Sequence, residues 1–399
     1  MNSNEQVICR KLKHLTFLLI NNLQNCTGSI LNMGIMLLNV IIIMFLSLNI
    51  RNSIRIEAIP NYRRTINSFT ESDCWNFFET KKSDLPRLLR AWRMPEIVRL
   101  DNGTKMPGEE VMLRSLYELV SGEDQYNIAV NVFGRDQSQQ SRALKWFVDH
   151  MYSTFQDLVT DNLDWWYENG YLYQSMVAIR TKFGGNGLFS TCAFIDCNCL
   201  ECCRPGGGPC YEGTDATRWD PLIQKAFYNG WKSNFGLKHQ TVDCAYGMTI
   251  DLHGPWSLRR NDLTLLRESN INNRLRDLQI GSPVQLTIYG DSIYPRLSHL
   301  KSSYRHEGAL DWMNEENRRY AKVRISIEWN YSITANLYKY LQNQNKLKIL
   351  GSNNTAKVYT VATIMRNCHV ALYGSETSNY FDLVIPDSFL EKYMQVPGY

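Results

Sequence analysis

The chain has 399 residues, of which 44% are hydrophobic, and this is enough for two or three domains with a sizeable core. Such a composition excludes a disordered protein. The formal net charge of +4 is the small difference between 43 Lys and Arg and 39 Asp and Glu. Any surface that binds a polyanion must therefore be a local patch of cations rather than the whole molecule.

A long uncharged segment lies near the N-terminus. Residues 15–50 contain no Asp, Glu, Lys or Arg, and residues 31–48 have the length of a membrane span. Asn32 and Asn39 interrupt the apolar run, and similar numbers of Lys and Arg flank it on both sides, which leaves its orientation undecided. Residues 1–55 therefore have three interpretations. They form a membrane anchor, they form a buried helix, or they are translated AT-rich non-coding DNA, which their bias toward Asn, Ile, Leu and Met favours.

The next part of the chain is expected to change from irregular to helical structure. Residues 56–105 mix charged and aromatic side chains and predict an irregular linker. Residues 106–183 predict helices, because residues 108–122 start with acids and end in Gly122, and a turn at Gly134 precedes a longer helix led in by Ser138. This order is typical of a helix-turn-helix module and also of an ordinary helical bundle.

Beyond Gly184 short apolar runs alternate with polar turns. Four runs predict strands, at residues 187–196, 236–247, 248–255 and 284–291. Residues 324–341 predict an amphipathic helix, with a stripe formed by Ile325, Trp329, Ile333, Leu337 and Leu341. Because such a stripe needs a sheet or other helices to cover it, the pattern predicts an α/β domain over residues 184–385 and a tail over residues 386–399.

Three acidic residues stand out within the predicted α/β domain. Asp196 and Asp291 each end an apolar strand, and Glu328 lies at the edge of the helical stripe. A buried carboxylate costs free energy unless it is paired or binds a cation. Three converging carboxylates suit hard divalent cations such as Mg²⁺, and two such ions can activate a water or a 3′-hydroxyl for attack on a phosphodiester. Any chain with 39 acids offers some trio, so this pattern alone leaves the function open.

Six of the eleven cysteines lie within nineteen residues, between Cys192 and Cys210. Cys197, Cys199 and Cys202, with Cys210 or His239, would supply four ligands for a structural zinc ion. No second C-x-x-C pair stands at the spacing of a zinc finger. Independent thiols that act as small hydrophobic side chains are the other interpretation.

The order of several motifs resembles that of PIF/Harbinger-type transposases and of the nucleases derived from them. After Asp196 these motifs are RPGG (204–207), FYNGWKSNFGLKHQ (227–240), GPWSLRRND (254–262), LLRES (265–269), YGDSIYP (289–295), RISIEWNYS (324–332) and RNC (366–368). The resemblance implies an RNase H-like catalytic domain, a mixed sheet flanked by helices, after a helix-turn-helix-like region. It also implies that Asp196, Asp291 and Glu328 bind Mg²⁺ or Mn²⁺ and act as the catalytic acids of a DNA endonuclease or transposase.

The resemblance also implies partners and a location. The substrate would be double-stranded DNA at transposon ends and at a target site. A Myb-like DNA-binding protein and a second copy of the chain are candidate partners. We expect the protein in the nucleus, or anchored in a membrane if residues 31–48 form a span. The candidate contacts to DNA phosphates are the cations in or beside the motifs, namely Lys232, Lys238, Arg259, Arg260 and Arg324.

The sequence departs from the family pattern directly after the first acid. The family usually has a small residue, then Thr or Ser, and often His, whereas this chain has Cys197, Asn198 and Cys199. The His that commonly precedes Asp262 is Asn261. These departures motivate an alternative hypothesis, in which the chain is a catalytically inactive, domesticated transposase that acts as a DNA- or protein-binding module.

Overall fold

A computed structural model of the chain describes residues 63–184, 190–205, 221–282, 284–305, 308, 310–342, 346–349 and 355–395. The N-terminal segment 1–55, with the candidate span at residues 31–48, lies outside these ranges. No helix in the described ranges is both long enough and apolar enough to cross a membrane.

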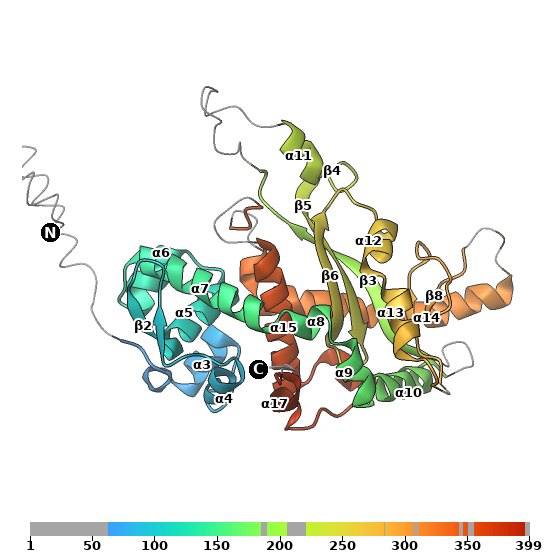
Figure 1. Ribbon diagram of the computed structural model, residues 1–399, viewed down its shortest axis with the longest axis horizontal. Helices are drawn as coiled ribbons and strands as arrows, with labels where there is room; N and C mark the ends of the chain where they lie inside the picture. The colour runs from blue at the N-terminus through green and yellow to red at the C-terminus, as the bar shows by residue number, and fades with distance from the viewer. Residues whose placement is uncertain are drawn as a thin grey trace, which may run out of the picture.

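A helical body precedes the sheet (Figure 1). It contains α3 (Glu71–Phe78), α4 (Leu85–Ala91), α5 (Gly108–Ser121), α6 (Gln125–Asn127) and α7 (Gln137–Phe155), with short helical turns η1 (Ile66–Ser68) and η2 (Ile128–Val132) and a small hairpin of β1 (Ile97–Arg99) and β2 (Lys105–Pro107). As predicted, Gly122 ends α5 in the left-handed conformation, with φ of +63°. Helix α7 begins one residue earlier than expected, because the side chain of Asp136 caps it by accepting from the amide of Ser138.

Residues 66–91 differ from the irregular linker that composition predicts. The Thr70 side chain accepts from the amide of Asp73 and the Asp73 carboxylate accepts from the amide of Thr70, which forms a reciprocal cap for α3. Cys74 and Phe78 of α3 and Leu85 of α4 are fully buried in the main core. A local cap and apolar side chains at helical spacing therefore order a segment whose overall composition suggests a loop.

The helical body and the sheet share one hydrophobic core. Helix α7 packs its apolar face against α5 and also against α15 (Thr355–Tyr373), which follows the sheet in sequence. Between α7 and the first long strand lie α8 (Asp157–Thr160), α9 (Leu163–Glu168) and α10 (Tyr171–Phe183). The C-terminal α17 (Phe389–Tyr393) also packs into this core through Phe389, which contacts the ring of Trp165. The predicted tail is thus a buried helix within the described residues.

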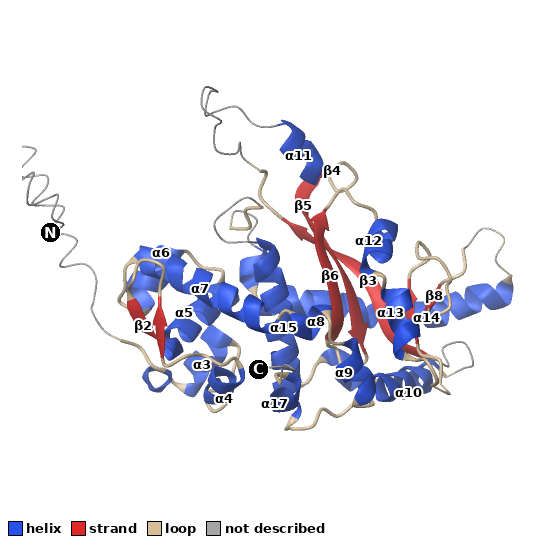
Figure 2. Cartoon of the chain, viewed as in Figure 1, coloured by secondary structure: helices blue, strands red, loops and turns tan. Residues whose placement is uncertain are grey.

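A mixed sheet forms the centre of the second half of the chain (Figure 2). Its strands lie in the order β6 (Thr249–Ser257), β5 (Asn234–Cys244), β3 (Thr191–Glu201), β7 (Thr287–Gly290) and β8 (Leu300–Ser302), and the short β4 (Tyr228–Asn229) pairs with the start of β5. Strand β5 is antiparallel to β3 and β6, whereas β7 and β8 are parallel to β3. This mixed sheet with its helices confirms the predicted α/β, RNase H-like fold class.

Helices cover both faces of this sheet, and successive side chains on β5 contact helices on opposite faces. Lys238 bonds to Asp262 of α12 (Asp262–Ser269), whereas His239 stacks on Tyr359 of α15 and Thr241 bonds to Tyr331 of α14 (Asp311–Leu337). The remaining helices are α11 (Pro221–Phe227), α13 (Ile271–Leu278), η3 (Lys339–Gln342) and α16 (Glu376–Tyr380).

Two predicted elements have different boundaries in the structure. Strand β3 does not end at Asp196 but runs on to Glu201, because its backbone stays paired with β5 from Ala193 to Glu201. Helix α14 begins at Asp311, thirteen residues before the predicted start. Its buried face includes Val323, Ile327, Asn330 and Thr334, whereas Ile325 is 42% exposed. A stripe that repeats strictly every four residues winds around a helix with 3.6 residues per turn, so the predicted stripe cannot all face the sheet.

Candidate active site

Parallel pairing of β3 and β7 brings Asp196 and Asp291 to the same level of the sheet. The last paired residues are Phe194 and Tyr289, and the two aspartates lie two positions further along their strands. Residues two apart on a strand share a face. The side chains of Asp196 and Asp291 therefore lie next to each other, beyond the end of β7. Gly290, directly before Asp291, leaves room for the ring of Tyr294, since a Cβ atom at Gly290 would lie 2.5 Å from that ring.

Helix α14 supplies the third acid together with a cation. The Arg324 guanidinium donates from Nη1 to Oδ2 of Asp196 at 3.0 Å and from Nη2 to Oε1 of Glu328 at 3.3 Å. Arg324 and Glu328 are four residues apart and therefore lie on the same face of the helix. The guanidinium predicted to contact DNA thus lies between two of the three predicted catalytic acids.

The surroundings of Asp196 make its carboxyl group harder to ionise. The pKa of Asp196 is raised to about 6, chiefly by burial and to a smaller degree by the carboxylates of Asp291 and Asp262, while the amide of Cys197 and the guanidinium of Arg324 act in the opposite direction. The Cys197 amide donates to Oδ1 of Asp196 at 2.8 Å. A carboxyl group in this position is stabilised in its ionised form by any cation that comes close to it.

The chemistry of the donors fits a hard divalent cation. The three acids offer only carboxylate oxygens, which are the ligands that Mg²⁺ and Mn²⁺ prefer. The guanidinium of Arg324 lies between two of these acids and takes the place of a metal ion there. Within the described ranges no three Asp, Glu, His or Cys side chains converge closely enough to hold an ion as they stand. The Glu328 side chain is 56% exposed and pairs with Arg324.

A polar cleft opens beside the three acids. It lies between the end of β7, β8 and the first half of α14 and has a volume of about 760 Å³. Its lining includes Asp291, Arg324 and Arg318, the further acids Asp311 and Glu315, and neutral side chains such as Asn314. This volume falls within the range of sites that bind small molecules or parts of larger ones. Of the three predicted catalytic acids, Asp291 lines the cleft directly, and Arg324 links the cleft to the other two.

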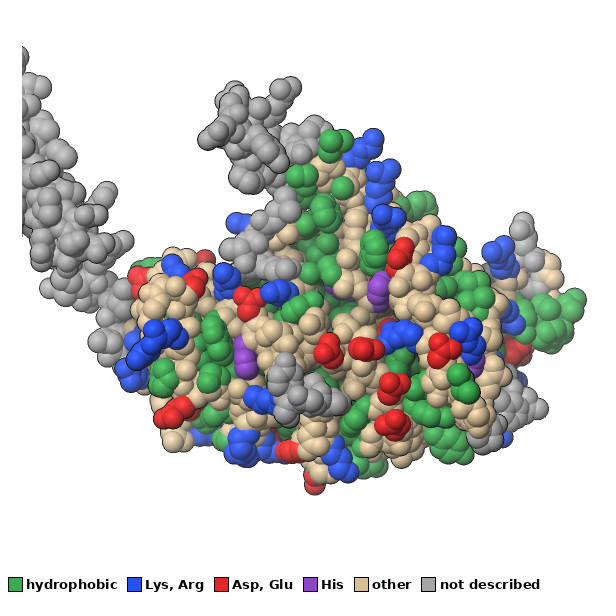
Figure 3. All heavy atoms as spheres, in the orientation of Figure 1, with side chains coloured by type: hydrophobic (Ala, Val, Ile, Leu, Met, Phe, Trp, Pro, Cys, Tyr) green, Lys and Arg blue, Asp and Glu red, His purple; other side chains and the backbone are tan. Residues whose placement is uncertain are grey.

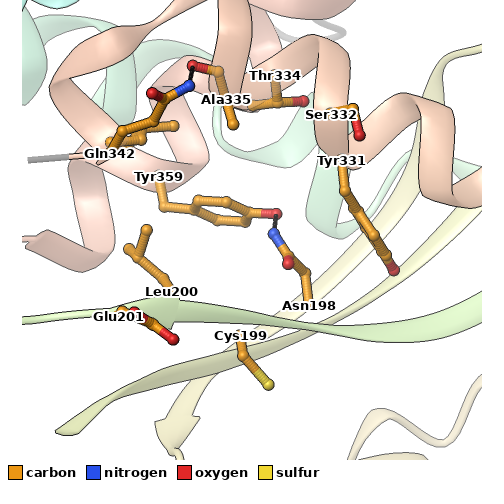
Figure 4. Close-up of a pocket in the computed structure, with 11 residues that line it drawn as sticks. Asn198, Cys199, Leu200, Glu201, Tyr331, Ser332, Thr334, Ala335, Gln342 and Tyr359 are labelled. Carbon is orange, nitrogen blue, oxygen red and sulfur yellow. Dashed lines mark hydrogen bonds between the residues drawn. The ribbon is translucent and has the colours of Figure 1, made fainter. Parts of the chain in front are cut away.

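The residues after Asp196 hold β3 to its neighbours. Cys197 contacts the hydroxyl of Tyr294 at 3.4 Å, and Nδ2 of Asn198 donates to the hydroxyl of Tyr359 at 2.7 Å. Figure 4 shows Asn198 and Tyr359 pointing toward one another at a pocket of about 340 Å³ between β3, α14 and α15, with Cys199 on the other side of the strand. The unusual sequence after the first acid thus has a packing role on both faces of the sheet.

The same alternation separates the proposed zinc ligands. His239 pairs in register with Asn198 and lies on the α15 face, so it cannot join Cys197 and Cys199, which lie on the opposite face. The cysteines in the described ranges, including Cys202, are free thiols. Cys210 lies outside those ranges, and no metal-binding cluster of cysteines forms inside them.

The remaining predicted DNA contacts fall into two groups. Lys238 is buried, and its ammonium donates to Oδ1 of Asp262 at 2.7 Å and to the carbonyl of Arg260 at 2.8 Å, so the structure uses it to pin α12 to the sheet. Lys232, Arg259 and Arg260 are exposed. For these three the contact with DNA stays a prediction.

Sequence reasoning missed two further roles. The first is the ion pair of Arg324 with Glu328, for which their spacing of four residues on a helix was a usable signal. The motif around Arg366 has a structural role, because the buried Arg366 bonds to the carboxylate of Asp243, the hydroxyl of Thr249 and the carbonyl of Gly247. Nothing in the order of motifs distinguishes this packing role from a catalytic one.

Residues 212–367 match the family of DDE superfamily endonucleases, and this stretch of the chain therefore carries a DDE endonuclease domain. The matched stretch includes Asp291, Arg324 and Glu328, whereas Asp196 lies before it. No curated protein and no solved structure is significantly similar to the chain.

Proposed function

We propose that the protein cleaves DNA phosphodiester bonds, as a transposase or a transposase-derived endonuclease, with Asp196, Asp291 and Glu328 as ligands of Mg²⁺ or Mn²⁺. The observation that carries this proposal is the position of Arg324, whose guanidinium is shared by Asp196 and Glu328 beside Asp291. The endonuclease domain that spans Asp291 and Glu328 supports the choice of DNA as the substrate.

Each residue of the site has a distinct part in this proposal. Two divalent ions bound there would activate the attacking water or 3′-hydroxyl and stabilise the leaving oxygen. Asp196 and Asp291 belong to paired strands and would keep their ligand oxygens in fixed positions. Glu328 would turn inward from α14. Arg324, once released from both acids, would present its planar guanidinium to a phosphate of the substrate.

A second candidate function is a binding module that retains the fold without catalysis. The specific observation in its favour is that the Arg324 guanidinium forms ion pairs with two of the three acids. In that case the guanidinium would be a permanent structural partner of Asp196, and the domain would hold DNA or a protein without cutting DNA.

Cleavage of a labelled DNA duplex by the full chain in Mg²⁺, in Mn²⁺ and in EDTA separates these functions. Asp291→Asn should reduce the cleavage rate by about a hundredfold or more, since even indirect partners of metal ligands typically contribute 10–100-fold. Asp277→Asn is the matched control, because Asp277 is an exposed acid of α13 that pairs with Arg276. A folded protein that binds the duplex but cuts it in neither metal would reject catalysis and support the binding module.

A further inference from the structure

The turn between β4 and β5 projects beyond the neighbouring strands. Strand β3 ends at Glu201, opposite Gly236, and Ser257 at the end of β6 lies opposite Leu237. Strand β4 accompanies the first residues of β5, with Asn229 opposite Asn234, and the amide of Cys202, just after β3, donates to the carbonyl of Phe235. In Figure 1 this hairpin and α11 stand out from the end of the sheet, away from the helical body.

A tryptophan sits in this turn with almost no cover. Trp231 is 96% exposed, more than any other large hydrophobic side chain in the described ranges. Tyr228, on the adjoining β4, is 40% exposed. Burial of an indole is favourable relative to exposure in water, so a ligand that covers Trp231 would gain binding free energy.

The backbone of the turn is held in one shape. The Oδ1 atom of Asn229 accepts from the amides of Trp231 and Lys232, at 2.9 and 3.1 Å. Its Nδ2 atom donates to the carbonyl of Leu258 at 2.8 Å, and this ties the turn to the segment that follows β6. One asparagine therefore fixes the tip and places Arg259 and Arg260 beside it.

The exposed charges of the segment that carries the tip are mostly positive, with Glu201 on the neighbouring β3 as an exposed acid opposite Gly236. Described residues 222–262 contain four exposed cations, Lys225, Lys232, Arg259 and Arg260. Their acids are Asp243 and Asp251, which are buried, and Asp262, which pairs with Lys238. Figure 3 shows Lys and Arg side chains gathered at this projecting end of the molecule. Such a surface complements a polyanion and repels other cationic surfaces.

We propose that this tip is a base-stacking contact, at which Trp231 covers an unpaired or extruded base of the DNA while Lys232, Arg259 and Arg260 bind the flanking phosphates. Nucleic acid is the occupant that combines a flat aromatic face with phosphate charge. The proposal rests on the proposed function only in taking DNA as the substrate.

Along β5, the tip and the acids are separated by less than one turn of duplex DNA. Asp196 pairs with Thr241, which lies seven residues along β5 from Asn234. At about 3.3 Å per residue the turn lies roughly 25 Å from Asp196 along the strand. A helical turn of duplex DNA is about 34 Å long. The stacked base would therefore lie within one turn of the phosphate that is cut.

Binding is measured separately from cleavage, with the Asp291→Asn protein as the parent and EDTA in all samples. The probes are a labelled, fully paired duplex and the same duplex with a one-base bulge that carries 2-aminopurine. Trp231→Ala should weaken binding to the bulged duplex by about tenfold and should relieve the quenching of 2-aminopurine that stacking causes. Trp231→Phe should retain most of the affinity. Tyr173→Ala is the matched control, because Tyr173 is an aromatic side chain of α10 that is 53% exposed.

Charge is tested by the dependence of affinity on salt. Lys232→Gln and Arg259→Gln should each lower the slope of log affinity against log salt by about 1 if each side chain binds one phosphate. Equal affinity and equal 2-aminopurine fluorescence for the parent and Trp231→Ala would overturn the proposal. Self-association that Trp231→Ala abolishes without any loss of DNA affinity would also overturn it and would assign the tip to a protein interface. Since no arm of the experiment requires cutting, an inactive enzyme and a failed stacking contact give different results.

Discussion

Replacing Arg324 by Gln should tighten the binding of Mn²⁺ to the candidate active site. Two unit charges 4 Å apart attract by about 4 kcal/mol at an effective dielectric constant near 20 and by about 1 kcal/mol in water. Arg324 and Asp196 are 24% and 22% exposed and Glu328 is 56% exposed, so the two ion pairs are closer to the weaker limit. We take their joint contribution as roughly 1–1.5 kcal/mol. Removing this competing cation should therefore raise the affinity for Mn²⁺ about fivefold to tenfold.

The assay is calorimetric titration of Mn²⁺ into the full chain without DNA, with the melting temperature recorded in EDTA and in Mn²⁺. Arg324→Gln should melt lower than wild type in EDTA, because Asp196 loses its partner, and should gain more from Mn²⁺, since binding to the folded state stabilises it. Arg319→Gln is the control, as it removes the same charge from the same helix, where Arg319 pairs with Glu315. Equal or weaker Mn²⁺ binding by Arg324→Gln, with Arg319→Gln unchanged, would refute the competition between the guanidinium and the metal.

Two further predictions concern stability. Arg366→Met should lower the free energy of unfolding in chemical denaturant by about 3–5 kcal/mol, because it leaves the buried carboxylate of Asp243 without its cationic partner, with the hydroxyls of Thr241 and Thr249 still donating to it; a loss under 1 kcal/mol would contradict this. Burial lowers the pKa of His239 to about 3, and neither ring nitrogen has a hydrogen-bond partner in the described ranges. The unfolded chain takes up this proton below about pH 6.5 and the folded chain does not, so His239 should cost about 3 kcal/mol of stability between pH 7 and pH 4. His239→Gln should flatten the pH profile of the unfolding free energy by that amount. An unchanged profile would contradict this prediction and would mean that the His239 ring lies in a more polar environment.

The strands of the sheet were predictable because their signals are local. Apolar runs bounded by turns gave all four predicted strands, and the covering helix was expected from its periodicity. The boundaries were less predictable, since they depend on partners far away in sequence. Strand β3 continues past Asp196 because β5 pairs with it, and β8, with only three residues, gives no pattern of its own.

The sequence proposes the residues of the candidate site but not their arrangement. Order and spacing of motifs pointed to Asp196, Asp291 and Glu328, and the strand register places the first two on adjacent strands. That Arg324 joins Asp196 to Glu328 could not be read from the sequence, because it depends on how α14 crosses the sheet. The same holds for Lys238, which looks like a surface cation in the sequence but is buried against Asp262.

The position of Arg324 adds to what the unusual residues after Asp196 imply. Cys197 contacts Tyr294 on one face of the sheet, whereas Asn198 lies on the same face as Asp196 and donates to Tyr359. Under the proposed function, an ion can bind Asp196 and Glu328 only if the Arg324 guanidinium leaves these two carboxylates. The proposed activity then depends on the competition between a guanidinium and a divalent cation, and the substitution at Arg324 measures that competition directly.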